Sequence, residues 1–199
     1  MTVEYKGLVM AGPLRWVVLS KGEEVTTFAF LVKVHYTVKG QGNVLFIRSD
    51  LSGDGRDDVF GVFTDNPALA RYLRDEVFNY TVFAGPPGQG SPAPIVEATF
   101  ESIGRVPLDT VERMKAADGT TFTLALREFD LPVAYIRRVR GNLMEVGACA
   151  RPSRFSLEIN GMTPMGEPRI GPLAEAPPIG GDLQNLWYLS QGEEITTAP

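Results

Sequence analysis

The stretch VTTFAFLVKVHYTV, residues 25–38, decides the fold class of this chain of 199 residues. Apolar residues alternate with polar ones along much of it, and β-branched and aromatic side chains are frequent, as is typical of a β-strand. Three neighbouring segments have the same character, at 14–20, 43–49 and 58–64. Short turn-like sequences that contain glycine join the four segments. The first third of the chain therefore predicts successive antiparallel hairpins.

One segment predicts a helix, TDNPALARYLRDEVFNY at residues 64–80. Asn66 can accept hydrogen bonds from the free amides of a first turn, and Pro67 fits that turn because its missing N–H is not needed there. Apolar side chains then recur at helical spacing on one face, namely Leu69, Tyr72, Leu73, Val77 and Tyr80. We therefore expect a helix over residues 67–80.

The remainder of the chain again favours strands. Phe122, Leu124 and Leu126 alternate cleanly, which predicts a strand there. Residues 109–117 are ambiguous, since they fit either a short helix or a strand that turns at the following Asp-Gly. Further strand-like segments lie at 94–104, 133–139, 143–150 and 153–160, and a last short element at 183–190.

About eight to ten strands with one helix predict a mainly β fold. We expect an antiparallel barrel or barrel-like sandwich with the α-helix near residues 67–80 inserted. Residues 1–189 are expected to form a single β-rich domain, and residues 190–199 a flexible C-terminal tail. The sequence LSKGEEVTT at 19–27 recurs as LSQGEEITT at 189–197, which indicates either chance or two similar edge turns.

The composition narrows the classes of partner. The net charge is −5, so there is no excess of Lys and Arg to neutralise the phosphates of a nucleic acid. No apolar run is long enough to span a membrane, and the N-terminus lacks a secretory signal pattern, so we expect a soluble cytoplasmic protein without a membrane partner. The single cysteine, Cys149, excludes a disulfide framework and a thiolate zinc site. The oligomeric state stays open.

One basic cluster stands out against this acidic composition. Arg137, Arg138 and Arg140 lie together in YIRRVRG. A solvated strand face or a turn accounts for them, and an anion site is the alternative, although no glycine-rich loop that opens a helix accompanies it.

The segment RSDLSGDGRDDVFGVF, residues 48–63, carries the most specific chemical pattern. Counted from Asp50, positions one, three, five and nine are Asp50, Ser52, Asp54 and Asp58, and the backbone carbonyl of Arg56 follows a glycine at position six. Alternate oxygens of a sharply bent loop can converge on Ca²⁺. Position twelve is a glycine rather than the glutamate of an EF-hand.

This loop resembles the calcium loops of FG-GAP repeats, in which a D-x-[DN]-G-D-G-x-x-D turn joins two strands. The resemblance implies that Asp50, Ser52, Asp54 and Asp58 are side-chain ligands of Ca²⁺, with Ser52 in place of the usual Asp or Asn. It covers about a dozen residues and occurs once, so the propeller fold is not implied. The alternative is an Asp-Gly-rich hairpin turn whose carboxylates accept hydrogen bonds from their own backbone.

Catalytic candidates are few. His35 is the only histidine and could act as a general acid or base near neutral pH. Glu97 and Glu145 lie in strand-like segments, where a carboxyl inside a barrel could carry a proton. Nucleotide-binding glycine motifs, the H-E-x-x-H zinc motif and G-x-S-x-G are absent. Any enzyme would therefore perform cofactor-free isomerase, lyase or cyclase chemistry, and plain strand residues are the alternative.

A β-barrel of this size can also enclose a small ligand. Aromatic residues in the strands would line such a pocket, namely Trp16, Phe28, Phe30, Tyr36 and Phe122. Three hypotheses follow: a protein that binds a small apolar or aromatic molecule, an enzyme on the same barrel, and a structural or interaction domain with a calcium-stabilised loop at 50–58.

Overall fold

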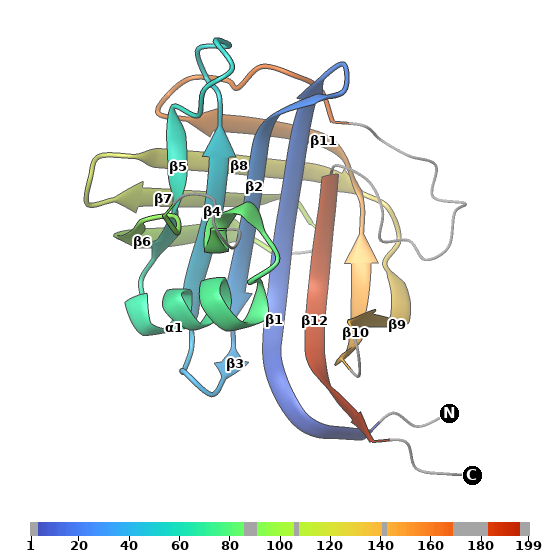
Figure 1. The fold of residues 1–199 in the computed structure, drawn as a ribbon. Coiled ribbons are helices and arrows are strands. Elements are labelled where there is room, and N and C mark those ends of the chain that lie inside the picture. Colours follow the sequence, from blue (N-terminus) through green and yellow to red (C-terminus); the bar gives the residue numbers. More distant parts are fainter. Residues whose placement is uncertain (1–3, 86–90, 106–107, 141–142, 169–182, 196–199) are drawn as a thin grey trace.

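Strands dominate the computed structural model, which describes residues 4–85, 91–105, 108–140, 143–168 and 183–195 (Figure 1). The expected mainly β fold is confirmed. The described strands are β1 (Glu4–Lys21), β2 (Glu24–Val34), β3 (Tyr36–Thr37), β4 (Gly42–Ser49), β5 (Val59–Thr64), β6 (Ile95–Gly104), β7 (Thr110–Ala116), β8 (Thr121–Phe129), β9 (Val133–Arg140), β10 (Leu143–Ala150), β11 (Pro152–Ile159) and β12 (Leu183–Ile195).

These 12 strands form one sheet in the order β11-β8-β7-β6-β5-β4-β2-β1-β12-β10-β9, with β3 paired to β1 outside this path. All ladders are antiparallel except β5–β6, which is parallel from Val62↔Ile95 to Thr64↔Glu97. The expected antiparallel arrangement is therefore corrected to a mixed sheet. Strands β6, β7, β8 and β11 cross behind the others at a steep angle (Figure 1), and we call them the back layer and the other strands the front layer.

Two apolar cores result from the alternation of side chains along the front strands. On β2, Ala29 and Leu31 face the back layer, where they pack in one core with residues such as Phe122 of β8. Phe30 and Val32 face the other way, into a second core beneath the helical segment. The period of two residues thus lets the front layer bury both of its faces.

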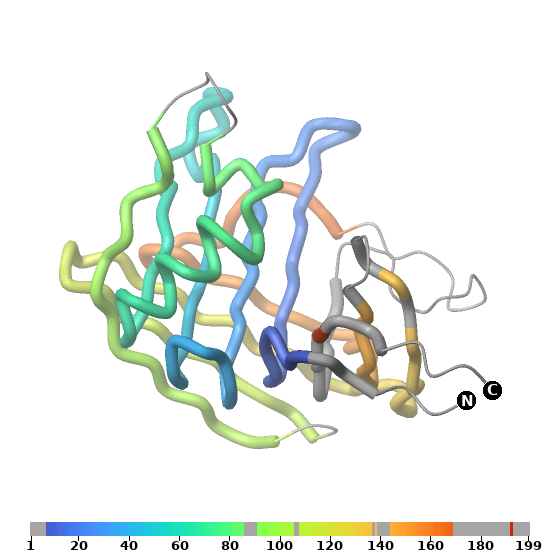
Figure 2. Tube along the Cα trace, turned by 60° about the horizontal axis from the view of Figure 1, so that its bottom comes forward, coloured from blue at the N-terminus to red at the C-terminus, as the bar shows by residue number. Residues whose placement is uncertain are grey.

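Two of the connections between the layers run through the strands and the chain segments that join them. The parallel β5–β6 pair is one of them. At the other, β8 leads into β9 and β10 leads into β11 around a corner (Figure 2). At this corner the Asp130 amide donates to the Arg151 carbonyl at 2.8 Å. Within the described residues, β11 and β9 end the strand order and no ladder joins them, so no closed barrel is detected.

The helical segment begins where the sequence predicts it. Asn66 Oδ1 accepts from the Leu69 amide at 3.1 Å, and α1 (Pro67–Tyr72) follows. It continues as the π-helical η1 (Leu73–Val77), and a short 3-10 turn, η2 (Val82–Ala84), comes later. Leu69, Ala70 and Leu73 are buried against the front layer, whereas Tyr80, expected on the same face, is exposed because the chain leaves the helix at Phe78.

Strand β2 ends earlier than the sequence indicates. Gly12 forms an irregularity in β1, and a Cβ there would overlap the carbonyl oxygen of Lys33. The amide of His35 donates to the Ala11 carbonyl at 2.8 Å, and Tyr36–Thr37 then pair with β1 as β3. The close approach of β1 at Gly12 therefore sets the end of β2.

Two further segments differ from expectation or resolve an ambiguity. Residues 110–116 form strand β7, so the strand alternative applies to the ambiguous segment. Residues 190–195, expected in a tail, belong to β12, which runs to Ile195 and pairs with both β1 and β10. The last four residues lie outside the described residues.

Candidate functional site

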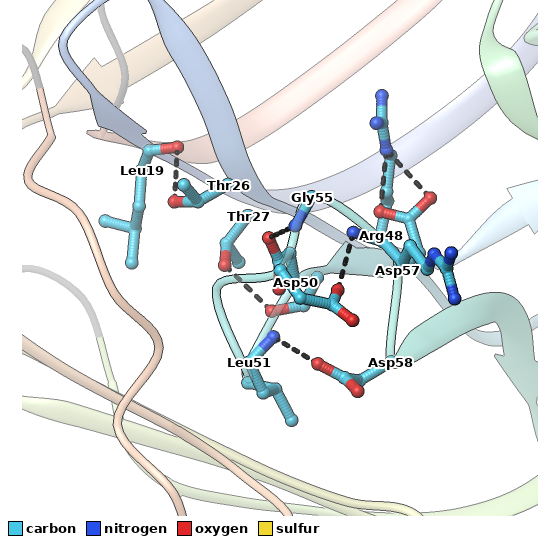
Figure 3. Close-up of polar contacts among 12 residues, drawn as sticks. Leu19, Thr26, Thr27, Arg48, Asp50, Leu51, Gly55, Asp57 and Asp58 are labelled. Carbon is cyan, nitrogen blue, oxygen red and sulfur yellow. Dashed lines mark hydrogen bonds and ion pairs between the residues drawn. The ribbon is translucent and has the colours of Figure 1, made fainter.

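The aspartate loop between β4 and β5 folds around its own carboxylates (Figure 3). The side chain of Asp50 is buried and accepts from the amides of Gly53 at 2.6 Å and Gly55 at 2.9 Å. The amide of Asp50 donates to the Thr26 carbonyl at 2.8 Å, which fixes the loop to β2. Asp50 therefore holds the loop by satisfying its backbone donors.

Asp58 has the same function at the other end of the loop. Its Oδ2 accepts from the amides of Leu51 and Ser52, both at 2.7 Å. These hydrogen bonds favour the charged form and lower the pKa of Asp58, with the Ser52 amide the largest cause. Asp54 Oδ1 accepts from the Arg56 amide at 3.0 Å. Three carboxylates are thus turned toward backbone N–H groups.

Asp57, the fourth aspartate, pairs with a side chain. The Arg48 Nε lies 2.9 Å from its Oδ1 and 3.0 Å from its Oδ2. Within the described residues, no group of three or more His, Cys, Asp or Glu side chains is placed to hold a metal ion. The hairpin-turn alternative accounts for this geometry, and calcium binding by Asp50, Ser52, Asp54, Asp58 and the Arg56 carbonyl stays a prediction.

His35 lines a polar groove at the opposite end of the β2 and β4 strands. The exposed imidazole follows β2 directly, and the groove also contains Asp65 from the end of β5. The other lining residues are Lys33, Val34, Gln41, Gly42, Asn43, Asn66 and Pro67. Three chain segments, 33–35, 41–43 and 65–67, thus bring amide, imidazole and carboxylate groups together.

Asp65 also lines an adjoining groove, which contains Glu97 of β6 and Lys115 of β7. The carboxylate of Asp65 accepts from the Asn43 amide at 2.7 Å and from Asn43 Nδ2 at 2.6 Å. A Cβ at Gly42 would lie 2.6 Å from Asp65 Oδ1, so only glycine leaves room for this carboxylate. We call the two grooves together the paired groove. Two of the three catalytic candidates, His35 and Glu97, lie in it.

Glu145, the third catalytic candidate, lies elsewhere. It is buried on β10, and its Oε1 accepts from the hydroxyl of Tyr135 on β9 at 2.8 Å. Tyr135 and Cys149 belong to the apolar core on the helical side of the front layer. The sequence placed Glu145 between apolar neighbours, but its phenol partner follows only from the pairing of β9 with β10.

The five aromatic residues expected to line one pocket are distributed over three environments. Trp16 packs edge-on against Phe28 and Phe30, with ring centroids 4.8 and 5.4 Å apart. This cluster belongs to the helical-side core, whereas Phe122 is buried in the core between the layers and Tyr36 is exposed. The structure does not bring the five together around one cavity.

An ion-pair network that the sequence analysis missed lies between the layers. Glu112 of β7 is within 2.8 Å of Lys33 Nζ and accepts from the Ser102 hydroxyl at 2.6 Å. Glu112 also pairs with Arg15 of β1. Burial lowers the pKa of Arg15, and the charge of Glu112 opposes that change. Had residues 109–117 been read as a strand, Glu112 would have fallen on the same face as the buried Met114.

The fold belongs to the mainly β class, and comparison with known proteins identifies no family for the chain. No protein-family model, no curated protein and no solved structure matches the chain. In the part of the chain that the structure describes, no helix has the length and apolar character needed to cross a membrane.

Proposed function

We propose that this protein binds a small polar molecule in the paired groove. The observation that carries the proposal is the position of the only histidine: His35 shares a groove with Lys33 and Asp65, and Asp65 connects this groove to Glu97 and Lys115. Concave sites that collect a few convergent polar groups are the usual places where small ligands bind.

The chemistry of the lining favours a ligand with both hydrogen-bond donors and acceptors. A neutral imidazole offers one donor and one acceptor, and Lys115, Asp65 and Glu97 add charged partners. Asp65 is held by the two N–H groups of Asn43, so its position does not depend on the ligand. A preformed carboxylate of this kind lowers the ordering cost of binding.

The location of the paired groove also supports the proposal. It lies beside the parallel β5–β6 pair, where Thr64↔Glu97 connects the front and back layers. This connection and the bent corner at Asp130 and Arg151 support a barrel-like sandwich as the finer description of the fold. Trp16 packs against Phe28 and Phe30, so these rings contact one another rather than line a cavity. This packing favours a polar surface groove over an interior aromatic pocket as the ligand site.

The single histidine allows a direct test by NMR, because its imidazole signals report on this groove alone. We would titrate the protein with individual amino acids, small carboxylates and sugars, and with small aromatic compounds as the contrasting class. We expect at least one polar compound to shift the His35 signals in a saturable way. Asp65→Asn should weaken that binding by about tenfold, the loss of one hydrogen-bonded charge.

The matched control is Asp54→Asn, which removes a carboxylate from the loop at the other end of the β4 strand. It should leave the affinity unchanged. If no polar compound shifts the His35 signals, or if only aromatic compounds bind and leave them unmoved, the proposal is wrong. The enzyme hypothesis would gain support in the same groove if the wild-type protein chemically converted a polar ligand on prolonged incubation and the His35→Ala variant did not.

A further inference from the structure

A second cleft lies in the back layer, where the connection between β6 and β7 meets the end of β8. Its lining residues are Gly104, Arg105, Leu108, Asp109, Glu128 and Phe129, and its volume is about 790 Å³. Small-molecule sites usually have volumes of about 300–1,000 Å³. The cleft shares no lining residue with the paired groove, so it is a separate candidate site.

A glycine shapes one wall of this cleft. Gly104 has φ +82°, and a Cβ there would overlap the carbonyl oxygen of Asp109. Beyond it the chain turns tightly, because the amide of Leu108 donates to the Arg105 carbonyl at 2.7 Å. Glycine therefore lets the backbone of Asp109 approach the end of β6, and the turn brings Arg105, Leu108 and Asp109 to one wall of the cleft.

Glu128 of β8 shapes the other wall. Its φ is +56°, in the left-handed region that residues other than glycine seldom adopt. The amide of Glu128 donates to Asp109 Oδ1 at 3.3 Å. The inward alternation of β8 runs to Leu126 and resumes with Phe129, which packs against the core between the layers. The left-handed residue thus orients the Asp109 carboxylate and returns Phe129 to the core.

Two opposite charges in the cleft are left without a counter-charge. Glu128 Oε1 lies 3.3 Å from Arg154 Nη1, so the charge of Glu128 has a partner. Within the described residues, the Arg105 guanidinium has no hydrogen-bond or ion-pair partner, and the Asp109 carboxylate accepts only the Glu128 amide. Arg105 and Asp109 line the same cleft without pairing with each other. The charges that remain for a ligand are therefore one positive and one negative.

Apolar surface accompanies these charges. Leu108 is 61% exposed, and Phe129 is half-buried in the same lining. We propose that this cleft binds a free α-amino acid with an apolar side chain. Its carboxylate pairs with Arg105 and its ammonium with Asp109, each through charge-assisted hydrogen bonds. Its apolar side chain packs on Leu108 and Phe129. Such a ligand is a zwitterion, so its two charges match the two that the cleft leaves unpaired.

The probe is leucine, and three related compounds each remove one part of it. Leucinamide lacks the carboxylate, N-acetylleucine lacks the ammonium, and glycine lacks the apolar side chain. Binding is followed by NMR through the amide of Glu128, which contacts Asp109 directly, whereas the His35 imidazole reports separately on the paired groove. We expect leucine to shift the Glu128 amide in a saturable way. Each of the three relatives should bind at least about tenfold more weakly.

Two variants test the charged groups, each with a matched control. Arg105→Gln and Asp109→Asn should each weaken leucine binding by about tenfold. Arg71→Gln removes an exposed arginine of α1, and Asp118→Asn removes a carboxylate that likewise accepts a backbone amide, that of Thr120 at 2.9 Å. Both controls should leave the affinity unchanged. Thermal melts check that all four variants are folded.

The comparison of leucine with leucinamide distinguishes direct binding by Arg105 from a structural effect. In Arg105→Gln the two compounds should bind equally, because the ligand carboxylate has lost its partner; a structural effect would leave their affinity ratio at the wild-type value. The proposal is overturned if leucine does not shift the Glu128 amide, if glycine or leucinamide binds the wild type as tightly as leucine, or if Arg105→Gln leaves that ratio unchanged. None of these results depends on whether the paired groove binds a ligand.

Discussion

Glu112 of β7 and Arg15 of β1 lie in different layers, and Glu112 Oε1 is 3.5 Å from Arg15 Nη2. Only 2% of Glu112 and 5% of Arg15 are exposed. Glu112 also contacts Lys33, whose ammonium reaches both Glu112 and Ser102. One carboxylate thus connects two cations of the front layer to the back layer, within an otherwise apolar core.

Replacing Glu112 should destabilise the protein strongly. Glu112→Ala leaves two cations between the layers without their carboxylate, and the loss of one partner of a buried ion pair typically costs about 3–5 kcal/mol. Glu101→Ala is the matched control, because Glu101 pairs with Arg113 at 3.0 Å on the exposed surface of neighbouring strands. Its effect should stay below about 1 kcal/mol. Denaturant unfolding measures both, and equal effects would contradict a structural function of the network.

The aspartate loop should make stability depend on pH in the acid range. Amide hydrogen bonds lower the pKa of Asp58 below its ordinary value, which is about 3.9 in an unfolded chain. The stabilisation from this group is therefore present above that pH and is lost as the pH falls through the lower pKa of the folded state. Asp58→Asn should reduce stability at neutral pH, and the difference from wild type should shrink as the pH falls below the folded-state pKa of Asp58. Unfolding curves measured across this pH range test the prediction, which is wrong if the difference in stability between Asp58→Asn and wild type stays constant.

Calcium binding by the same loop can be tested independently of pH. The carboxylates of Asp50 and Asp58 already accept backbone amides, so we expect Asp50→Ala to lower the melting temperature with and without calcium. The measurement is thermal unfolding of chelator-treated protein with and without millimolar calcium. If calcium raises the melting temperature of the wild type and Asp54→Ala abolishes that rise, the loop is an ion site, because a ligand specific for the folded state stabilises it.

Gly12 should tolerate no side chain. A Cβ there would overlap the backbone carbonyl of Lys33, and Gly12→Ala must push β1 away from β2 near His35. We expect a loss of at least about 2 kcal/mol. Gly7→Ala is the matched control on the same strand, since a Cβ at Gly7 has nothing within 4 Å. Chemical denaturation distinguishes the two, and similar stabilities would show that β1 can shift at low cost.

Sequence patterns predicted the elements that are determined by interactions between residues close together in the chain. Alternation identified β1, β2, β4 and β5, and Asn66 was recognised as the cap of α1 because its side chain needs only the next turn of backbone. The parallel β5–β6 pair had no such signal, since it depends on how residues far apart in the chain meet. The same limit applies to the candidate site: Glu97 comes to lie in one groove with Asp65 only through this pairing, which places Thr64 opposite Glu97.

The repeated sequence shows how far context overrides local preference. In LSKGEEVTT, Gly22 adopts φ +64° and the chain turns from β1 into β2. In LSQGEEITT, Gly192 lies inside β12 and pairs with Leu8 of β1. Nearly identical residues therefore turn where the next strand is their neighbour and stay extended where two strands already flank them. The expectation of two similar edge turns is wrong for the second copy.

The position of β12 sets the order in which this protein can be completed during translation. β1 is made first, yet its partner Leu183–Ile195 follows all the other described strands in the chain. Until the ribosome has delivered that segment, the facing edges of β1 and β10 have no strand between them. A nascent chain stalled before Leu183 would expose both edges to neighbouring polypeptides and would depend on chaperones for protection.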